Sequence, residues 1–245
     1  MRKSILYYLY QPYKWLVFAP FLIVNTLLFG LLAVLFSMLI NQRTGSYIGG
    51  VIWSRINAWF TPIIIKVKGR NNIQKNTSYV VIANHQSQYD IFIMYGWLGI
   101  DLKWIMKKEL KKIPGIGFGS QKVGHIFLDR SNSRVAMESL NEAKKKLVNG
   151  NSVIIFPEGT RTKTGQMGTF KRGAFKLAKD LELPILPITI IGSKNILPTG
   201  TFDLFPGKAE MIIHEPFSSE EVEKRSLKEL MESSKEIINS ALPNK

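Results

Sequence analysis

Residues 80–90 of the chain read VVIANHQSQYD, and the expected fold is organised around this stretch. Its four leading apolar residues predict a short buried strand, which a polar loop follows directly. The loop contains His85, one of only three histidines in 245 residues, and Asp90 lies five positions later. The apolar residues 91–98 predict a helix, so the chain passes here from strand to loop to helix.

The spacing allows His85 and Asp90 to meet only if the chain turns between them, because side chains at i and i+5 do not share a helix face. Histidine exchanges protons near neutral pH. A carboxylate bonded to one ring nitrogen would fix its tautomer and stabilise the imidazolium. The pattern thus indicates a catalytic pair. A plainer interpretation stays open, in which Asp90 only favours a helix N-terminus and His85 is an ordinary loop residue.

Composition limits the class of protein. A length of 245 residues indicates one sizeable domain with a small appendage. The absence of cysteine excludes disulfides, a thiol nucleophile and a thiolate metal site. The net charge of +15 indicates an anionic partner, either nucleic acid or a membrane surface. The first acidic residue is Asp90, and nine basic residues precede it: Arg2, Lys3, Lys14, Arg43, Arg55, Lys66, Lys68, Arg70 and Lys75.

Residues 15–40 carry no charge and favour a membrane over nucleic acid. At about 1.5 Å per residue, a helix of this length exceeds the ~30 Å hydrocarbon core. Pro20, Asn25 and Gly30 interrupt the run, so a tilted single span and a bent or hairpin-like helix pair both stay open. The run is too long for a usual signal-peptide core, and no clear cleavage site follows it.

Residues 47–65 predict either a second membrane-touching helix or an amphipathic helix packed on the domain, and Pro62 marks its end. Strand and helix then alternate. We expect an α/β fold with a mixed central sheet flanked by helices, divided into a membrane-anchoring helical region at 1–62 and a domain at 63–245. The expected strands are 63–68, 78–83, 102–106, 124–128, 152–156, 185–191 and 209–214; the expected helices are 91–98, 133–149, 173–181 and 219–241.

Other motifs point away from metal and nucleotide chemistry. Residues 115–119, GIGFG, lack the GxGxxG spacing and a following helix start. No GxSxG nucleophile elbow occurs in the sequence. His125 and His214 belong to no HExxH motif and there is no cysteine, so we expect both to be structural and no metal to be bound.

Three further blocks complete a recognisable set: FLDR at 127–130, FPEGTR at 156–161 and LPI at 186–188. With the first block, in this order, they resemble the glycerolipid acyltransferase family, in particular the 1-acylglycerol-3-phosphate acyltransferases. The resemblance covers residues 63–215. It implies transfer of a fatty acyl group from acyl-CoA or acyl-ACP to the sn-2 hydroxyl of 1-acyl-sn-glycerol-3-phosphate, which makes phosphatidic acid without a cofactor.

This chemistry requires deprotonation of a hydroxyl, stabilisation of an oxyanion and a hold on an anionic acceptor. His85 would be the general base and Asp90 its orienting carboxylate, with direct attack on the thioester. Ser87 is a weaker candidate for a covalent nucleophile, because it lies too close in sequence to His85 for an easy approach.

The resemblance also implies a set of substrate-binding residues. Arginine forks suit a phosphate monoester, Gly159 lets the backbone come near it, and Glu158 would orient Arg161 or a substrate hydroxyl. A solvated lysine-rich face and a local Asp129–Arg130 ion pair are the plainer interpretations. The full expected set is Lys107, Lys108, Asp129, Arg130, Glu158, Gly159, Thr160 and Arg161.

The expected location is a membrane of the inner, cytoplasmic or ER type, with the catalytic domain on the cytoplasmic side, although basic residues on both flanks of the apolar run leave the orientation open. The expected partners are a lysophospholipid acceptor, the acyl donor with its carrier protein where that is the donor, and anionic membrane lipids, but no nucleic acid. Two alternatives remain: the same chemistry on glycerol-3-phosphate or another lysophospholipid, and a non-catalytic protein that binds anionic lipids.

Overall fold

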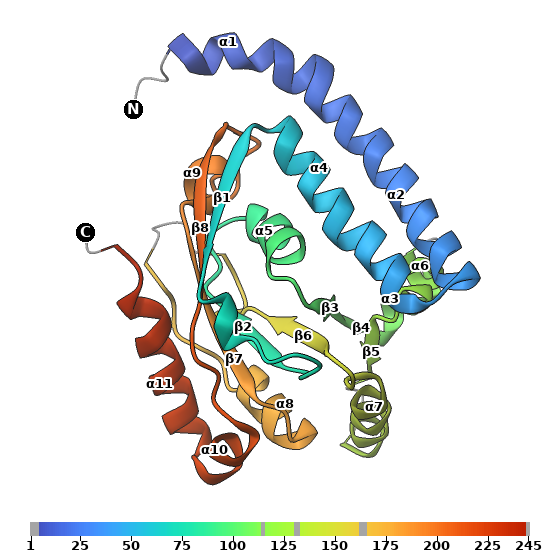
Figure 1. The fold of residues 1–245 in the computed structure, drawn as a ribbon, viewed down its shortest axis with the longest axis vertical. Coiled ribbons are helices and arrows are strands. Elements are labelled where there is room, and N and C mark those ends of the chain that lie inside the picture. The colour runs from blue at the N-terminus through green and yellow to red at the C-terminus, as the bar shows by residue number, and fades with distance from the viewer. Residues whose placement is uncertain (1–4, 114–115, 130–132, 162–165, 244–245) are drawn as a thin grey trace.

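The computed structural model describes residues 5–113, 116–129, 133–161 and 166–243 (Figure 1). A six-stranded sheet has the order β1-β8-β7-β2-β6-β3, and a second sheet pairs β4 with β5. Within the six-stranded sheet β7 and β8 are antiparallel, and the other neighbours are parallel. The strands are β1 Ile63–Lys68, β2 Val80–Ala83, β3 Asp101–Lys103, β4 Ile105–Lys107, β5 Ile126–Leu128, β6 Asn151–Ile155, β7 Ile185–Ile191 and β8 Gly207–Ile213. The expected mixed α/β sheet is confirmed.

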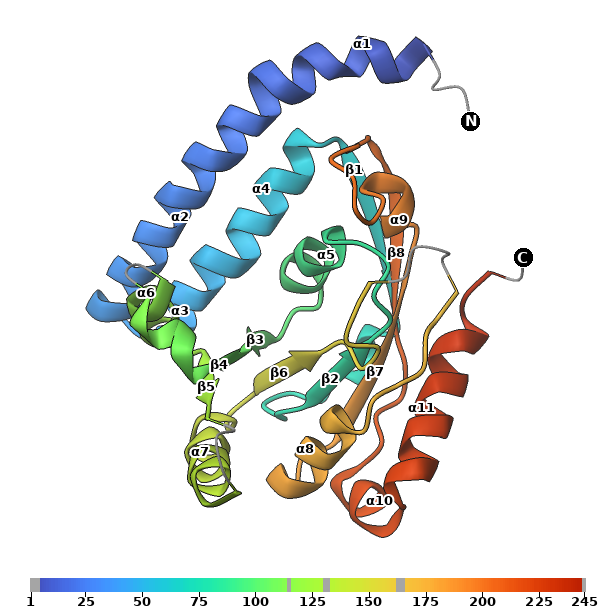
Figure 2. The ribbon, with the colours of Figure 1, turned by 180° about the vertical axis from the view of Figure 1, so that it is seen from behind.

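Helices cover both faces of the large sheet, and the two views in Figures 1 and 2 show them as separate layers. The helices of the domain are α5 Tyr89–Trp97, α6 Ile116–Lys122, α7 Ser133–Lys146, α8 Gly173–Leu181, α9 Ser193–Ile196, α10 Ser219–Lys224 and α11 Leu227–Ser240. Strand β2 lies between the layers. Val81 and Ala83 belong to one buried cluster, and Val80 and Ile82 to the other. This explains why β2 reads as an unbroken apolar run.

Three of the expected elements differ from those in the structure. The helix expected at 219–241 is divided into α10 and α11, because Ser226 begins a new helix with a capping box to Glu229. The strand expected at 102–106 is divided into β3 and β4 at Trp104. The expectation that no helix begins in residues 115–119 is wrong, since α6 starts at Ile116.

The amino-terminal region is one long bent helix (Figure 1). It consists of α1 Ile5–Tyr13, a π-helical segment Lys14–Phe18 and α2 Ala19–Leu39. Pro20 lacks an N–H, and its ring would crowd the carbonyl four residues earlier. The π-helical segment directly before it widens the turn at this point. Asn25 and Gly30, expected to interrupt the run, lie inside α2.

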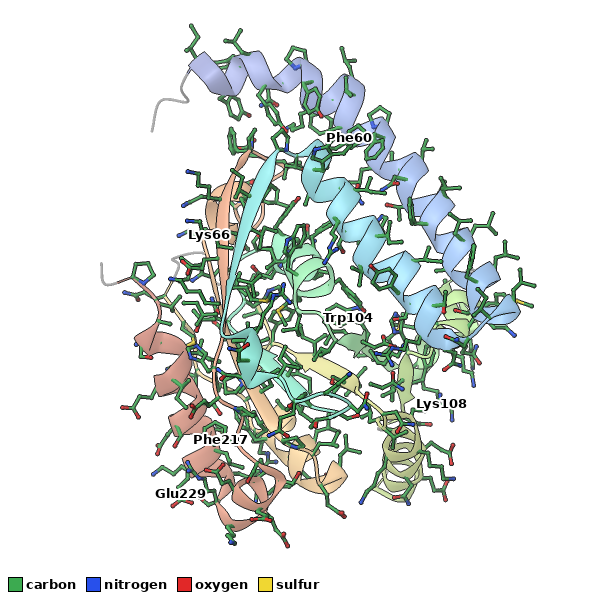
Figure 3. The ribbon with its side chains drawn as sticks, viewed as in Figure 1. Phe60, Lys66, Trp104, Lys108, Phe217 and Glu229 are labelled. Carbon is green, nitrogen blue, oxygen red and sulfur yellow. The ribbon has the colours of Figure 1, made fainter. Side chains whose placement is uncertain are left out.

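A second helix, residues 42–60, returns beside the first (Figures 1 and 2), whereas the run 15–40 forms one bent helix and no hairpin of its own. Asn41 caps α3 Gln42–Ser46 by accepting a hydrogen bond from the Thr44 N–H at 2.9 Å. The helix continues through the π-helical segment Tyr47–Ile52 into α4 Trp53–Phe60. The rings of Phe21 and Phe60 stack with centroids 3.7 Å apart. Figure 3 labels Phe60 at this contact.

Helix α4 also packs on the domain. The rings of Trp53 and Phe92 stack with centroids 4.7 Å apart, Arg55 Nε donates to the carbonyl of Gly96 at 2.8 Å, and Ala58 is buried. The outer face of α2 is different. The helix Tyr7–Leu39 is long and apolar enough to cross a membrane, and little of it is buried. Its exposed apolar side chains include Ile23, Val24, Leu27, Leu28, Leu31, Leu35, Met38 and Leu39.

Candidate active site

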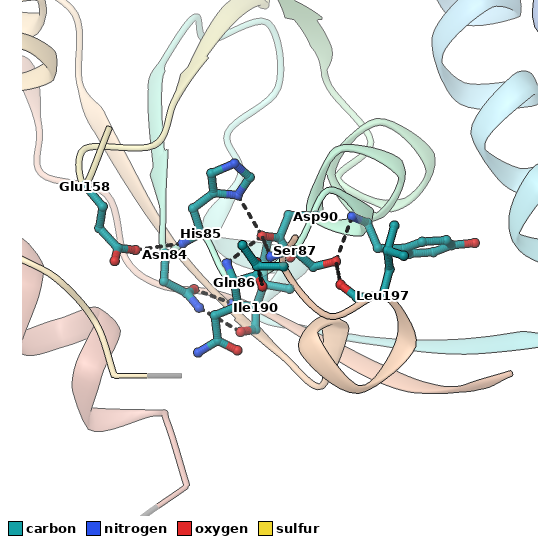
Figure 4. A network of polar contacts seen from close by, with 10 residues as sticks. Asn84, His85, Gln86, Ser87, Asp90, Glu158, Ile190 and Leu197 are labelled. Atoms are coloured by element: carbon teal, nitrogen blue, oxygen red, sulfur yellow. Dashed lines mark hydrogen bonds and ion pairs between the residues drawn. The ribbon is translucent and has the colours of Figure 1, made fainter. Parts of the chain in front are cut away.

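The loop after β2 wraps around one buried carboxylate (Figure 4). Asp90 Oδ2 lies 2.8 Å from His85 Nδ1, and the backbone N–H groups of Gln86 and Ser87 donate to the same oxygen at 2.8 and 3.0 Å. Asp90 stands in the first turn of α5, where a negative charge is favoured by the helix dipole. The turn that the spacing of His85 and Asp90 requires is therefore present.

The imidazole of His85 is held on two sides. Its Nδ1 faces Asp90, and its ring stacks on Phe156, with centroids 3.9 Å apart and planes at 11°. The carboxylate selects the tautomer with the proton on Nδ1. Figure 4 shows the other ring nitrogen, Nε2, pointing away from the polar network, and no residue in the described part of the chain bonds it. Nε2 is thus the atom that a substrate hydroxyl can approach.

The hydroxyl of Ser87 is occupied by structural bonds. It donates to the carbonyl of Leu197 at 2.6 Å and accepts from the Tyr89 N–H at 3.0 Å, and the side chain is buried. Asn84 fixes the start of the same loop. Its amide donates to the carbonyl of Ile190 at 2.9 Å and accepts from the N–H of that residue at 2.7 Å. Sequence reasoning gave no role to Asn84, because its partner lies 106 residues away.

Glu158 joins two loops rather than binding Arg161. Its Oε1 accepts from the His85 N–H and its Oε2 from the Gly168 N–H, both at 2.8 Å. The side chain is buried. No contact between Glu158 and Arg161 occurs among the described residues, and the other expected role, orienting a substrate hydroxyl, stays a prediction. Glu158 comes next to His85 because β2 and β6 are parallel neighbours, and both loops leave the same edge of the sheet.

A lysine that the sequence analysis did not single out lies on the Pro157–Gly159 turn. Gly159 has φ +72°, and a Cβ placed there would lie 2.7 Å from Lys171 Nζ. The Lys171 N–H donates to the carbonyl of Pro157 at 2.8 Å. Thr160 and Arg161 follow on the same loop, and no hydrogen bond or ion pair joins either to another described residue. The sequence signal that could have identified Lys171 is the adjacent basic pair Lys171 and Arg172, directly ahead of an expected helix.

Lys107 and Lys108 form a second basic group in the expected set, and one of them is in a local ion pair. Lys108 Nζ lies 2.8 Å from Asp129 Oδ2, and this exposed pair raises the pKa of Lys108. Lys107 is exposed at the end of β4. Figure 3 labels Lys108 on this outer part of the molecule. Arg130 lies outside the described residues.

The other two histidines have structural surroundings. Burial, with a smaller effect of Lys103, lowers the pKa of His125 to about 4, and its Nδ1 accepts from the Trp104 N–H at 3.4 Å. Burial also lowers the pKa of His214, whose Nε2 lies 2.9 Å from Thr189 Oγ1. No cluster of three candidate ligands for a metal ion occurs among the described residues.

Residues 64–191 match the family model described as acyltransferase. This is more than half of the chain, so the chain belongs to the acyltransferase family. It is similar to the 1-acyl-sn-glycerol-3-phosphate acyltransferase of Pseudomonas aeruginosa, with 32% identity over 73% of this chain and 70% of that protein. Its fold is similar to the crystal structure of the 1-acyl-sn-glycerophosphate (LPA) acyltransferase PlsC from Thermotoga maritima. That comparison has a TM-score of 0.68 and 28% identity, and it covers 91% of this chain and 100% of the other.

Some relatives are much longer. The chloroplastic 1-acyl-sn-glycerol-3-phosphate acyltransferase of Arabidopsis thaliana is 37% identical over 62% of this chain, and the match spans 43% of that protein. The chain therefore corresponds to less than half the length of this relative.

Proposed function

We propose that the chain is a 1-acylglycerol-3-phosphate O-acyltransferase with His85 as its general base. The acceptor is lysophosphatidic acid, the donor is acyl-CoA or acyl-ACP, and the product is phosphatidic acid. The observation that carries the proposal is the geometry of His85, whose Nδ1 lies 2.8 Å from a buried carboxylate while Nε2 has no bond to a described residue. The family match and the names of the relatives support the same reaction.

The proposed step balances without a covalent enzyme intermediate. His85 Nε2 takes the proton of the sn-2 hydroxyl as the hydroxyl oxygen attacks the thioester carbonyl carbon. Asp90 stabilises the imidazolium that forms. The tetrahedral intermediate collapses, the carbon–sulfur bond breaks, and the imidazolium returns its proton to the thiolate. Ser87 takes no covalent part, because its hydroxyl already bonds Leu197 and Tyr89.

The acceptor phosphate is assigned to the basic groups on the loop after β6. Arg161 offers a bidentate fork, and Lys171 adds an ammonium group held over Gly159. Glu158 supports this site indirectly, by tying the loop to the backbone of His85. Lys107 and Arg130 remain proposed members of the phosphate site, with Lys108, Asp129 and Thr160 at its edge.

The proposed placement is at a membrane, with the exposed face of α2 in the lipid and the catalytic domain on the cytoplasmic side. The lysophospholipid acceptor then stays in its bilayer, while the donor, including a carrier protein where one is used, arrives from water. Each buried CH₂ of an acyl chain contributes about 0.8 kcal/mol to membrane retention, so extracting the acceptor into water would be costly.

The test is a substitution of the base. His85→Ala should reduce turnover by about 10²- to 10⁴-fold while the thermal unfolding midpoint stays close to that of the wild type. Purified protein would be assayed with labelled acyl donors and a panel of lysolipids, including glycerol-3-phosphate. A folded His85→Ala protein with normal turnover would refute the mechanism. Undetectable acyl transfer by the wild type on every acceptor would favour the lipid-binding alternative.

A further inference from the structure

A cavity of about 210 Å³ lies between the second amino-terminal helix and the turn after α5, away from His85. One wall is a stripe of residues four positions apart, Arg43, Tyr47, Val51 and Arg55, which therefore face the same way. The opposite wall is residues 99–102, between α5 and the end of β3. The cavity is not part of the proposed acyl-transfer site, none of whose residues line it.

Two arginines, Arg43 and Arg55, line this cavity, and a third, Arg70, lies beside the lining residue Gly99. Arg55 Nε donates to the Gly96 carbonyl at 2.8 Å, and an Arg70 terminal nitrogen donates to the Trp97 carbonyl at 2.7 Å, so both stabilise the carboxyl end of α5. The other Arg70 terminal nitrogen is 3.1 Å from where a Gly99 Cβ would lie. Each of these bonds uses one of five guanidinium donors.

Arg43 differs from the other two arginines. It is exposed, and its guanidinium forms no hydrogen bond or ion pair with any residue that the structure describes. Burial is the main cause that lowers the pKa of Lys103, and the charge of Arg43 acts in the same direction to a smaller extent. A structural role for Arg43 is therefore not evident in its contacts.

The acidic residue in the lining is already neutralised. Asp101 is the acid among the described lining residues, and its Oδ2 lies 2.9 Å from Lys103 Nζ. Its Oδ1 accepts from Ser46 Oγ at 2.7 Å. The carboxylate thus offsets Lys103 and leaves the positive charge of the arginines in excess. Such a cavity favours an anion, and planar guanidinium forks favour a phosphate.

The neighbourhood indicates where the phosphate comes from. Met38, Leu39 and Ile40 directly precede this helix and are 59%, 72% and 59% exposed, and Tyr47 in the lining is 52% exposed. Apolar side chains beside an arginine and a tyrosine match the boundary between hydrocarbon and headgroups. On this basis, and resting on the proposed membrane placement of α2, we propose that the cavity binds the phosphate of an anionic membrane-lipid headgroup, separately from the acceptor.

The test measures how strongly the full-length protein prefers phosphatidylcholine vesicles containing phosphatidylglycerol to vesicles of phosphatidylcholine alone. Arg43→Gln should lower this preference about five-fold, the equivalent of ~1 kcal/mol for one basic residue at the surface. Arg43→Lys should also lower it, because an ammonium cannot form the bidentate contact. Lys224→Gln is the matched control, since it removes one charge from α10 at the far end of the molecule (Figure 1) and should have no effect.

Two results would overturn the inference. An Arg43→Lys protein with wild-type preference would show that only general surface charge acts. Abolition of the preference by millimolar-range inorganic phosphate, at constant ionic strength, would assign the cavity to free phosphate rather than lipid. The measurement involves no acyl transfer, so His85→Ala protein should show the wild-type preference. A failed headgroup test is thereby distinguishable from a failed proposal about the reaction.

Discussion

At the scale of single residues, Asp90 combines a structural and a proposed chemical task in one oxygen atom. Oδ2 accepts from two backbone N–H groups and faces His85 Nδ1, while Oδ1 is buried without a hydrogen bond from the described residues. The charge therefore acts almost entirely through Oδ2. A substitution can therefore remove the charge of the Asp90 side chain while it keeps the shape of that side chain.

Asp90→Asn should keep the loop but lose the reaction. The amide oxygen can replace Oδ2, whereas the neutral side chain cannot stabilise an imidazolium, so kcat should fall by about 10²- to 10⁴-fold. The amide NH₂ would replace Oδ1 where no acceptor is present, which costs about 1–3 kcal/mol of stability. Steady-state kinetics and thermal unfolding measure the two effects. Unchanged kcat in the folded variant would contradict the assigned role.

Arg161→Ala and Lys171→Ala should raise the acceptor KM about 10-fold or more and change kcat little. Both remove charge-assisted contacts, worth about 1.5–3 kcal/mol each, to a phosphate present in ground and transition states alike. Lys228→Ala, an exposed charge on α11, is the control. If the donor KM rises instead, the acceptor phosphate has to be assigned to other residues.

The predictable part of the site is the part that is local in sequence. His85 and Asp90 share one loop, so their pairing required only a turn. The bonds that hold this loop were not predictable, because Asn84 pairs with Ile190, and Glu158 with the N–H of His85, across long sequence separations. A side-chain amide or carboxylate can accept a hydrogen bond from any buried N–H group, so the residue type does not determine which N–H group it binds.

At the scale of elements, one misjudged segment depends on a close backbone contact and another on a local signal that the sequence contains. Residues 115–119 were expected to lack a helix start, yet α6 begins there. Gly117 is needed for a close approach, since a Cβ would lie 2.0 Å from the Lys111 carbonyl oxygen. The division between α10 and α11 could have been predicted from the sequence. Ser218 with Glu221 and Ser226 with Glu229 each have the spacing of a capping box.

The contact between the two amino-terminal helices depends on glycine. A Cβ on Gly45 would lie 1.8 Å from Ser37 Oγ and 2.3 Å from the Ala33 carbonyl oxygen. Gly45→Ala should therefore destabilise the protein by about 1–3 kcal/mol. Gly30→Ala is the matched control, because a Cβ there meets nothing within 4 Å, and removing a helical glycine should stabilise by up to ~1 kcal/mol. Thermal unfolding in detergent compares them, and equal effects would contradict the close packing.

His125 should make stability depend on pH. Its pKa is about 4 in the folded protein and 6.5 as an ordinary value, so the unfolded chain binds the extra proton first. Stability is then fully present above about pH 6.5 and declines as pH falls toward 4, by up to ~3 kcal/mol. His214 acts in the same direction. His125→Gln should flatten this decline between pH 7 and 5. A variant with the wild-type pH dependence would contradict the assignment to His125.

At the scale of the whole molecule, a continuous series of contacts joins the exposed apolar helix to the site. Helix α2 contacts α4, and α4 contacts α5, whose first turn contains Asp90. The loop after β2, which contains His85, and the loop after β6 meet at the same edge of the sheet. Membrane attachment through α2 would therefore hold the site at a fixed height above the lipid. Because α4 is buried on its inner side, the test of attachment should change the outer face of α2 and leave the helix pair in place.

The last prediction concerns that outer face. Leu27, Leu31 and Leu35 lie on one stripe and are 71%, 67% and 44% exposed. Burying a leucine side chain contributes about 1.5–3 kcal/mol. Replacing all three with glutamine should therefore weaken vesicle binding by several orders of magnitude without disturbing the core. Flotation with vesicles measures the loss. Replacing Lys228, Glu232 and Lys235 on α11 with glutamine should leave binding unchanged.

The same variant separates anchoring from catalysis. It should lose activity on acceptor embedded in vesicles but keep most activity on a short-chain acceptor dissolved in water, because the site residues are intact. The intact protein should resist washing at high salt, since burial of apolar side chains is not screened by ions. Complete release by salt alone would show that attachment is only electrostatic. Normal flotation of the triple glutamine variant would show that this face of α2 does not enter the lipid.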